Sequence, residues 1–175
     1  EVIKRIPKGI AQEVEVLVIN DASTDNTVEM ALGADYVIHT GKSRGVGYAF
    51  FFGIQECLKR GADIVVNIDG DGQFHPEDIK KLLVPLINDE ADMVTASRFM
   101  DPSFSYSMPR MKKIGNKLFS WLISKLSRED FKDTQCGFRA YTREACLQMN
   151  LFGNYTYTQE VFLDLLSKNL RIKEI

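Results

Sequence analysis

Two aspartates separated by one residue follow a short apolar run near the middle of the chain. Residues 64–68 are mostly β-branched, and Asp69, Asp71 and Gln73 come after them at alternate positions, with glycines between. Alternation along an extended chain places these three side chains on the same side. Carboxylate and amide oxygens are ligands that Mg²⁺ or Mn²⁺ prefers, usually together with substrate phosphates. The pattern therefore predicts a divalent-cation site, and the competing interpretation is a solvated Asp-Gly turn.

A second acidic turn follows an apolar run near the N-terminus. Residues 14–19 are apolar except Glu15, and Asp21 and Asp25 lie in the Ser- and Thr-rich segment beyond them. Their carboxylates can accept hydrogen bonds from a nucleotide base or ribose, although turn formation and helix capping alone also explain such a segment. The carboxyl ends of parallel strands meet in one crevice, so we expect the two acidic turns to share it.

Basic residues gather in the second half of the chain. From Arg98, which follows the apolar residues 93–96, to Lys125 there are six basic residues and one acidic residue. The whole chain has a net charge of −2, so this local excess favours an anionic partner. A solvated helix face is the competing interpretation.

The helix predicted over residues 110–126 carries many of these basic residues and also an apolar stripe. Its apolar side chains recur every four residues, at Ile114, Leu118, Leu122 and Leu126. We expect this stripe to pack on the core. Because Trp121 and several lysines share the helix, a position in a membrane interface is the alternative.

A polar turn before a later apolar run holds further candidate residues. Asp133 is expected to face the crevice, and Arg139 to pair with a phosphate or a carboxylate. Cys136 has no neighbouring His in the sequence, which argues against nucleophilic catalysis. His75, beside the first acidic turn, is a candidate metal or phosphate contact.

The elements that position these residues alternate along the first hundred residues. Predicted strands cover residues 14–19, 36–38, 62–69 and 93–96, with helices at 27–32, 46–59 and 76–87 between them. After Ser97 the pattern changes, with helices at 110–126, 143–149 and 158–168 and strands at 137–141 and 170–175. The alternation predicts an α/β fold, with a mostly parallel central sheet and helices on both faces.

Length and composition narrow the class of protein. With 175 residues, 45% of them apolar and 26% charged, the chain fits one globular domain. Its small net charge excludes a general attraction to nucleic acid. Three cysteines without a C-x-x-C pair indicate neither a zinc site nor a disulfide framework and favour a reducing cytoplasm. The sequence holds no signal peptide and no apolar run long enough to span a bilayer.

Several segments together resemble a known family. They are VLVINDASTDNT, ADIVVNIDGDGQFHPEDI, VTASRF, MPRMKKIGNKLFS, DTQCGFRAYTREA and YTQEVFLDLLSKNLRIKEI. The set is similar to the family 2 glycosyltransferases, and more narrowly to the branch of polyprenyl-phosphate (dolichyl-phosphate) mannosyl- and glucosyltransferases. The likeness covers nearly the whole chain in the same order.

The resemblance implies a fold and a domain organisation. The fold would be the GT-A nucleotide-diphospho-sugar transferase fold. Residues 1–175 would form a single catalytic domain that lacks the family's first strand and any C-terminal membrane segment. The protein would then be cytoplasmic, and peripheral to or anchored at the cytoplasmic face of a membrane.

The resemblance also implies roles on the donor side. Asp21 would contact the nucleotide base, and Asp69 would lie near the ribose and the metal. Asp71 and Gln73 would coordinate Mg²⁺ or Mn²⁺ together with the donor diphosphate.

On the acceptor side, Arg98, Arg110 and Lys113 would hold a phosphate, with Arg139 as a further phosphate contact. Asp133 would act as a base or contact the sugar, and Asp71, Arg98 and Asp133 are the expected catalytic residues. Ile114 stands where that branch carries Ser.

The function implied is transfer of a hexose, with inversion, from a nucleotide-sugar of the GDP-mannose or UDP-glucose type to a lipid-linked phosphate. One alternative keeps the fold and changes the acceptor to a saccharide hydroxyl, with Asp133 as an essential base. Another alternative is a nucleotide-sugar-binding module without catalysis.

Overall fold

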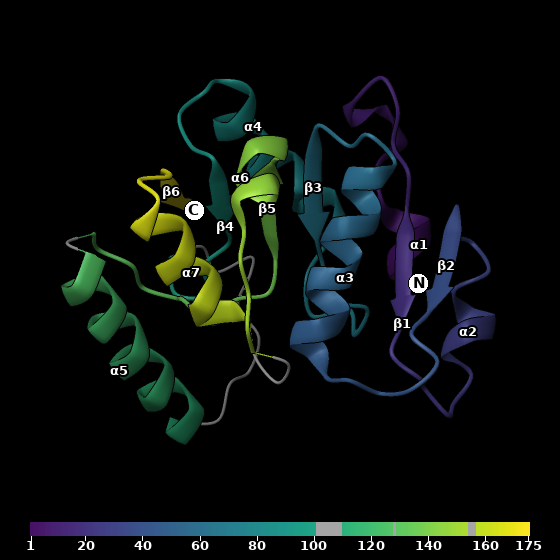
Figure 1. Ribbon diagram of the computed structural model, residues 1–175, viewed down its shortest axis with the longest axis horizontal. Coiled ribbons are helices and arrows are strands. Elements are labelled where there is room, and N and C mark those ends of the chain that lie inside the picture. Colours follow the sequence, from purple (N-terminus) through teal and green to yellow (C-terminus); the bar gives the residue numbers. More distant parts are fainter. Residues whose placement is uncertain (101–109, 128, 154–156) are drawn as a thin grey trace.

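Strands and helices alternate along the chain in the predicted order (Figure 1). The computed structural model describes residues 1–100, 110–127, 129–153 and 157–175, apart from the side chains of Arg110 and Lys112. The strands are β1 Leu17–Asn20, β2 Tyr36–His39, β3 Ile64–Asn67, β4 Met93–Thr95, β5 Arg139–Thr142 and β6 Ile172–Glu174. The helices are α1 Val2–Arg5, α2 Thr27–Met30, α3 Val46–Lys59, α4 Ile79–Ile87, α5 Arg110–Ser127, α6 Arg143–Gln148 and α7 Thr158–Ser167. Two short 3₁₀ turns are η1 Lys8–Ile10 and η2 Pro76–Asp78.

The described strands form two sheets. One sheet is β1 beside β2, parallel, and the other has the order β3-β5-β4-β6. β5 pairs antiparallel with both β3 and β4, whereas β4 and β6 are parallel. The expected α/β class with a mostly parallel sheet is confirmed, because β3, β4 and β6 run in the same direction and β5 between them runs in the opposite one.

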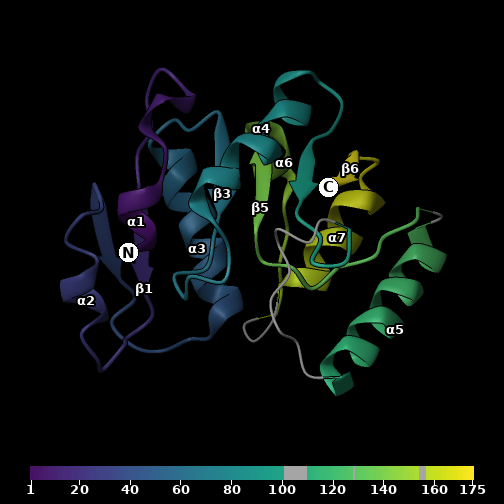
Figure 2. The same ribbon diagram turned by 180° about the vertical axis from the view of Figure 1, so that it is seen from behind.

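The four-stranded sheet is buried on both faces. Met93 and Tyr141 point to a cluster with α3, α6 and α7, while their neighbours Val94 and Ala140 point to a cluster with α4. Figures 1 and 2 show these two helical layers on opposite sides of the sheet. A strand that is covered on both faces needs apolar residues at successive positions. This explains the continuous apolar runs in the sequence.

Helix α5 packs in the orientation opposite to the expected one. Leu118 is 62% exposed and Trp121 57%, whereas Asn116 and Ser120 are almost fully buried. The prediction that the apolar stripe packs on the core is wrong. The helix lies at the edge of the molecule beside α7 (Figure 1). Asn116, Ser120 and Ile123 are the residues of α5 that face inward. In the part of the chain that the structure describes, no helix combines the length and the apolarity needed to cross a bilayer.

Candidate functional site

The first acidic turn lies at the carboxyl end of β3. The backbone N–H of Gln73 donates to Asp71 Oδ1 over 3.0 Å. Gly72 has a φ of 78°, a conformation that favours glycine. The side chains of Asp71 and Gln73 are exposed. The turn is therefore fixed by local hydrogen bonding, and its oxygen ligands face outward from the end of a buried strand.

Asp69 occupies a more crowded position than Asp71. A Cβ placed on Gly137 would lie 2.8 Å from Asp69 Oδ2 and 3.3 Å from the Tyr157 hydroxyl. Desolvation by these surroundings raises the pKa of Asp69, and the negative charge of Asp71 raises it further. The positive charges of Arg139 and Arg98 oppose this rise. A desolvated carboxylate whose ionised form is disfavoured by a neighbouring negative charge is a donor that suits a cation.

Asn67 and Tyr157 form a small hydrogen-bonded group beside Asp69. Asn67 donates one hydrogen bond to the Gly137 carbonyl over 2.7 Å and one to the Tyr157 hydroxyl over 3.1 Å. The Tyr157 ring stacks on Phe50 at 3.9 Å between centroids. Burial raises the pKa of Tyr157 to about 12, so it stays protonated. The sequence pattern did not single out Asn67 or Tyr157, although a polar Asn inside the β-branched run 64–68 was a usable signal.

The number of protein ligands for a cation is limited. In the described ranges no group of three or more His, Cys, Asp or Glu side chains converges as a metal site would require. An ion at this turn would be held by two carboxylates at most, together with the side-chain amide oxygen of Gln73. Its other ligands would come from substrate phosphates and water.

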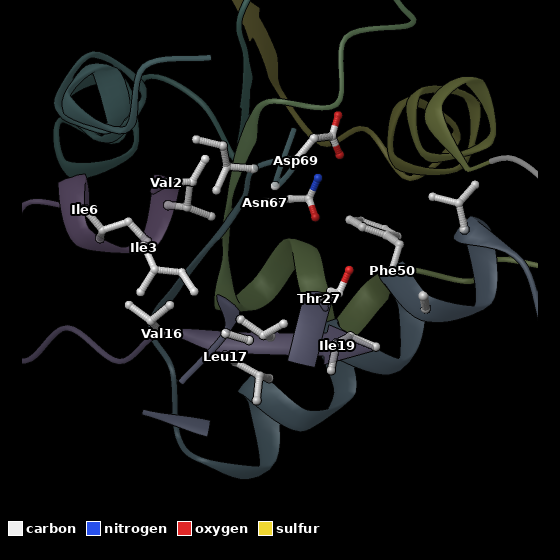
Figure 3. A pocket seen from close by; sticks show the side chains of 18 of the residues that line it. Val2, Ile3, Ile6, Val16, Leu17, Ile19, Thr27, Phe50, Asn67 and Asp69 are labelled. Carbon is white, nitrogen blue, oxygen red and sulfur yellow. The ribbon is translucent and has the colours of Figure 1, made fainter. Parts of the chain in front are cut away.

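A cavity of about 920 Å³ opens beside this turn, between β1 and β3 (Figure 3). Its walls are mainly apolar and come from α1, β1, α3 and β3. Polar side chains line it at Thr27, Asn67 and Asp69, and Asp25 lies there too. Asp25 and Asp69 therefore border the same space, as expected for two acidic turns that share one crevice.

Asp21 does not line this cavity and is bound to the loop before α3. It accepts hydrogen bonds from the Thr40 hydroxyl over 2.7 Å and from the amides of Arg44 and Gly45 over 3.1 and 2.9 Å. Burial alone would raise the pKa of Asp21, but these hydrogen bonds outweigh it and lower the pKa. The adjacent Ala22 has a φ of 59°, which costs a non-glycine residue about 1 kcal/mol. Asp21 thus holds this loop, and its contact with a base stays a prediction.

Arg98 and Asp133 form a buried ion pair. Arg98 Nε donates to Asp133 Oδ2 over 2.7 Å and its Nη2 to Oδ1 over 2.8 Å, and the Asp133 side chain is 0% exposed. Asn116 of α5 donates to Oδ1 over 2.9 Å. Glu174 of β6 accepts the Asp133 amide over 2.6 Å. Burial would raise the pKa of Asp133, but the hydrogen bond and charge of Arg98, with Asn116, lower it. A carboxylate so fully engaged is poorly suited to remove a proton from a substrate.

Arg139 is an internal residue, contrary to its expected contact with a phosphate. It is 0% exposed and donates to the carbonyls of Thr134 and Thr158, each over 2.9 Å. Its guanidinium also lies 4.8 Å from the centre of the Phe162 ring. A phosphate cannot reach a side chain that is enclosed in this way, so the predicted contact is wrong. Arg139 contributes instead through its charge, which opposes the rise in the pKa of Asp69.

The other residues predicted from the sequence lie near the acidic turn or near the ion pair of Arg98 and Asp133. Lys113 is exposed on α5. Its Nζ lies 5.7 Å from the centre of the ring of Phe99, which is the residue that follows Arg98. The side chain of Arg110 lies outside the described residues. His75 Nδ1 lies 3.1 Å from Arg5 Nη2, on the side of the turn that faces α1. Cys136 is buried and desolvation raises its pKa to about 12, which agrees with the absence of a nucleophilic role.

Comparison with known proteins identifies the family. Residues 1–149 match the family described as Glycosyl transferase family 2. The chain belongs to this family, and the resemblance found in its sequence is confirmed.

Two curated relatives carry names from the polyprenyl-phosphate branch. UDP-N-acetylglucosamine--dolichyl-phosphate N-acetylglucosaminyltransferase of Methanococcus voltae is 31% identical over 148 residues, 74% of this chain and 59% of the relative. Polyprenol monophosphomannose synthase of Mycolicibacterium smegmatis is 29% identical over 146 residues, 79% of this chain and 55% of the relative. The chain thus spans between half and three fifths of the length of these two relatives.

Solved structures identify the fold. Glucosyl-3-phosphoglycerate synthase from Mycobacterium tuberculosis, in complex with Mn²⁺, uridine diphosphate and glucosyl-3-phosphoglycerate, matches with a TM-score of 0.76. The match covers 99% of this chain and 62% of that one, at 20% identity. The predicted GT-A fold is confirmed.

The contact between Gly137 and Asp69 leads to a first prediction. Gly137→Ala should displace the Asp69 carboxylate, because a Cβ 2.8 Å from Oδ2 lies inside van der Waals contact. We expect Mn²⁺ affinity to fall by about 10- to 100-fold, the usual effect of disturbing a ligand's support. Gly115→Ala on α5, where a Cβ meets nothing within 4 Å, is the control. Unchanged calorimetric Mn²⁺ affinity in Gly137→Ala would contradict the predicted role of Asp69.

The raised pKa of Asp69 leads to a second prediction. A carboxyl group with a folded-state pKa above its unfolded value destabilises the fold where it is ionised, and this effect disappears as pH falls through the folded pKa. Asp69→Asn should therefore melt at a higher temperature than the wild type at neutral pH without metal, and the difference should shrink in acid. Added Mn²⁺ should raise the melting temperature of the wild type only. An equal response of both proteins to Mn²⁺ in thermal scans would count against Asp69 as a ligand.

The ion pair leads to a third prediction. Arg98→Met should leave a buried, unpaired carboxylate and cost about 3 kcal/mol of unfolding free energy. Adding Asp133→Asn to that variant should restore part of the loss. The lowered pKa of Asp133 means that its stabilisation is present above the usual carboxyl range, about pH 4, and is lost as pH falls through the folded pKa. Urea unfolding at several pH values measures both effects, and a double variant no more stable than Arg98→Met would refute the pairing.

Proposed function

We propose that this chain is the catalytic part of a glycosyltransferase that moves a sugar from a nucleotide-sugar to a polyprenyl (dolichyl-type) phosphate. The observation that carries the proposal is the pair of carboxylates, Asp69 and Asp71, at the open end of β3 beside a large cavity. Family membership and the names of the two curated relatives support both the reaction type and the lipid phosphate acceptor.

The donor would lie across the acidic turn and the cavity. Asp69, Asp71 and Gln73 are the proposed ligands of a Mg²⁺ or Mn²⁺ ion, in keeping with the raised pKa of Asp69, to which desolvation and the charge of Asp71 contribute. Such an ion neutralises charge on a leaving diphosphate. Asp25, Thr27 and Asp69 border the cavity, and the nucleotide would bind at these polar side chains. The proposed donor is a nucleotide-sugar of the GDP-mannose or UDP-glucose type.

The acceptor would bind on the side of Arg98 and Lys113. A phosphate monoester is mostly ionised at neutral pH, since its second pKa is about 6. It therefore attacks the sugar without a strong protein base, on the face opposite the leaving group. The engaged state of Asp133 favours this acceptor over a saccharide hydroxyl, which would need Asp133 free to take a proton.

We also propose that residues 1–175 act as one catalytic domain whose sheet is completed by a strand outside these residues. Among the described strands, β1 pairs only with β2 and β3 only with β5, so each leaves one edge open. Both strands line the cavity, whose walls are mainly apolar. An additional strand between β1 and β3 would fill the apolar part of the cavity, satisfy the open backbone groups and join the two sheets, leaving the nucleotide to the polar side chains of Asp25, Thr27 and Asp69. The proposed location of this domain is the cytoplasmic side of a membrane.

The fourth prediction tests the metal turn by activity. Asp71→Asn should lower kcat by about a thousandfold with donor and metal saturating, because removing a charge-stabilising ligand costs several kcal/mol in the transition state. The assay offers labelled GDP-mannose and UDP-glucose with short polyprenyl phosphate and Mg²⁺, and counts label in the lipid extract.

The matched control is Asp63→Asn, an exposed aspartate beside the opposite end of β3, which should keep full activity. Near wild-type turnover in Asp71→Asn would refute the metal role. Label found only on a saccharide would show that the acceptor is a saccharide hydroxyl and not a lipid phosphate. Donor binding without transfer to any acceptor would favour a non-catalytic module.

A further inference from the structure

The four-stranded sheet ends in a row of polar residues at the edge where the candidate site lies. Arg139 of β5 lies opposite Asn67 of β3 on one side and opposite Thr95 of β4 on the other, and Thr95 lies opposite Glu174 of β6. Residues directly opposite one another in neighbouring strands point to the same face of a sheet. We call these four residues the polar row.

The polar row interrupts a face that is otherwise apolar. Two positions further into each strand, the residues on the same face belong to the hydrophobic core: Val65, Tyr141, Met93 and Ile172. In the polar row, Arg139 and Thr95 are fully buried, and burial raises the pKa of Glu174. Apolar side chains would fill these positions at a lower cost of desolvation. The reason for polar side chains here therefore lies in the groups that they bind.

Glu174 holds the start of the segment that leads into β5, residues 132–137, which we call the bridge segment. Its carboxylate accepts the backbone N–H of Lys132 on Oε2 over 2.7 Å and that of Asp133 on Oε1 over 2.6 Å. A carboxylate can accept both because each of its oxygens is an acceptor, whereas a side-chain amide has one acceptor oxygen. The start of the bridge segment is thus fixed to β6.

Arg139 and Asn67 hold the rest of the bridge segment. Arg139 Nη2 donates to the Thr134 carbonyl over 2.9 Å. Asn67 Nδ2 donates to the Gly137 carbonyl over 2.7 Å. Side chains from β3, β5 and β6 therefore bind backbone groups at both ends of the bridge segment and between them, and so determine its course.

The bridge segment contacts both halves of the candidate site. At its start, the Asp133 carboxylate binds the Arg98 guanidinium through both oxygens. At its end, a Cβ on Gly137 would lie 2.8 Å from Asp69 Oδ2, so the backbone there passes directly against that carboxylate. Asn67, which holds this end, lies beside Asp69 at the cavity (Figure 3). One short segment thus separates the proposed acceptor residue from the proposed metal ligand.

We propose that Asn67, Arg139 and Glu174 are positioning residues of the transfer reaction, which hold the bridge segment between the metal turn and the acceptor side. This inference rests on the proposed function, which assigns Asp69 to the metal and Arg98 to the acceptor phosphate. Attack of a phosphate oxygen on the sugar requires the reacting atoms to lie about 3–3.5 Å apart, and a displacement of about 1 Å costs on the order of a hundredfold in rate. The polar row sets this separation because the segment that it holds touches both halves.

The fifth prediction compares variants at the two ends and in the middle of the bridge segment. Glu174→Gln keeps the size of the side chain and loses one of two backbone contacts, so the KM for short polyprenyl phosphate should rise about tenfold, the usual effect of losing a hydrogen bond to a charged group. Asn67→Val frees the Gly137 carbonyl, so Mn²⁺ affinity should fall about tenfold. Because Arg139 holds the middle, each change should leave the other constant nearly unchanged.

Arg139→Lys tests the middle of the bridge segment. Lysine keeps the positive charge but lacks the planar fork that reaches the carbonyls of Thr134 and Thr158 together. The separation of the two halves should then vary, and kcat with donor, acceptor and metal saturating should fall about a hundredfold. The transfer assay of the fourth prediction and calorimetry with Mn²⁺ measure these constants.

Thr95→Val is the matched control from the polar row itself. The Thr95 hydroxyl donates to the carbonyl of Ala96, the next residue in the chain, over 3.2 Å. Valine has the same shape without the hydroxyl, so this variant should lose some stability and keep the kinetic constants and the Mn²⁺ affinity of the wild type. Urea unfolding of every variant shows how far a change in these constants follows the loss of stability.

A second measurement does not depend on activity. Arg98 Nε–H donates to Asp133 Oδ2 over 2.7 Å, and NMR of nitrogen-labelled protein follows its exchange with solvent. This exchange should become at least tenfold faster in Glu174→Gln, because Asp133 then loses part of its backbone support. In Thr95→Val it should be that of the wild type.

The outcomes distinguish this inference from the proposed function. Separate effects of Glu174→Gln on the acceptor KM and of Asn67→Val on Mn²⁺ affinity, with faster Arg98 exchange in Glu174→Gln, support both. The same Mn²⁺ and exchange results in a protein whose wild type transfers no sugar to lipid phosphate would support the polar row and refute the proposed acceptor. Wild-type constants and exchange in Glu174→Gln and Asn67→Val, or changes that match those of Thr95→Val at equal loss of stability, would overturn the inference.

Discussion

The arrangement around the candidate site depends on the buried ion pair of Arg98 and Asp133. A buried carboxylate is tolerated only when its charge is matched and its oxygens accept hydrogen bonds. Arg98 comes from the end of β4, Asn116 from α5, and Glu174, which accepts the Asp133 amide, from β6. Three segments far apart in the sequence are thus held around one side chain. Displacing any of them would expose the charge of Asp133 to an unfavourable apolar environment, so the ion pair fixes their relative positions.

The orientation of α5 follows from this constraint. Asn116 and Ser120 must face Asp133 and Thr134, so the opposite side of the helix faces outward whatever residues it carries. An amphipathic pattern by itself shows that a helix has two faces and does not show which one meets the protein. The expectation that the apolar stripe turns inward failed here because the side of the helix that faces the protein carries the buried hydrogen bonds of Asn116 and Ser120, together with Ile123 in the core.

Features that depend on neighbouring residues could be predicted from the sequence, and features that depend on contacts between distant residues could not. Element order, the α/β class and the two acidic turns followed from patterns within a few residues, such as the β-branched run before Asp69. The antiparallel insertion of β5 depends on strands that are distant in sequence, which hydrophobic periodicity does not encode. Arg139 was expected to pair with a phosphate or a carboxylate, yet two backbone carbonyls and the Phe162 ring enclose it, and these partners are distant in the sequence or lie on the backbone. Asn67 had a local signal as a polar residue inside an apolar strand, but its partners Gly137 and Tyr157 could not be inferred from it.

Arg98 links the two halves of the candidate site electrostatically. Its charge stabilises Asp133 and also opposes the rise in the pKa of Asp69, whose ionised form is disfavoured by desolvation and by Asp71. An anion bound beside Arg98 would offset that positive charge and leave the Asp69 carboxylate less stabilised. The attraction of the turn for a cation would then increase, since a nearby positive charge is what the ionised pair lacks. Acceptor phosphate and metal ion would in this way favour each other's binding through one arginine, without any movement of the backbone.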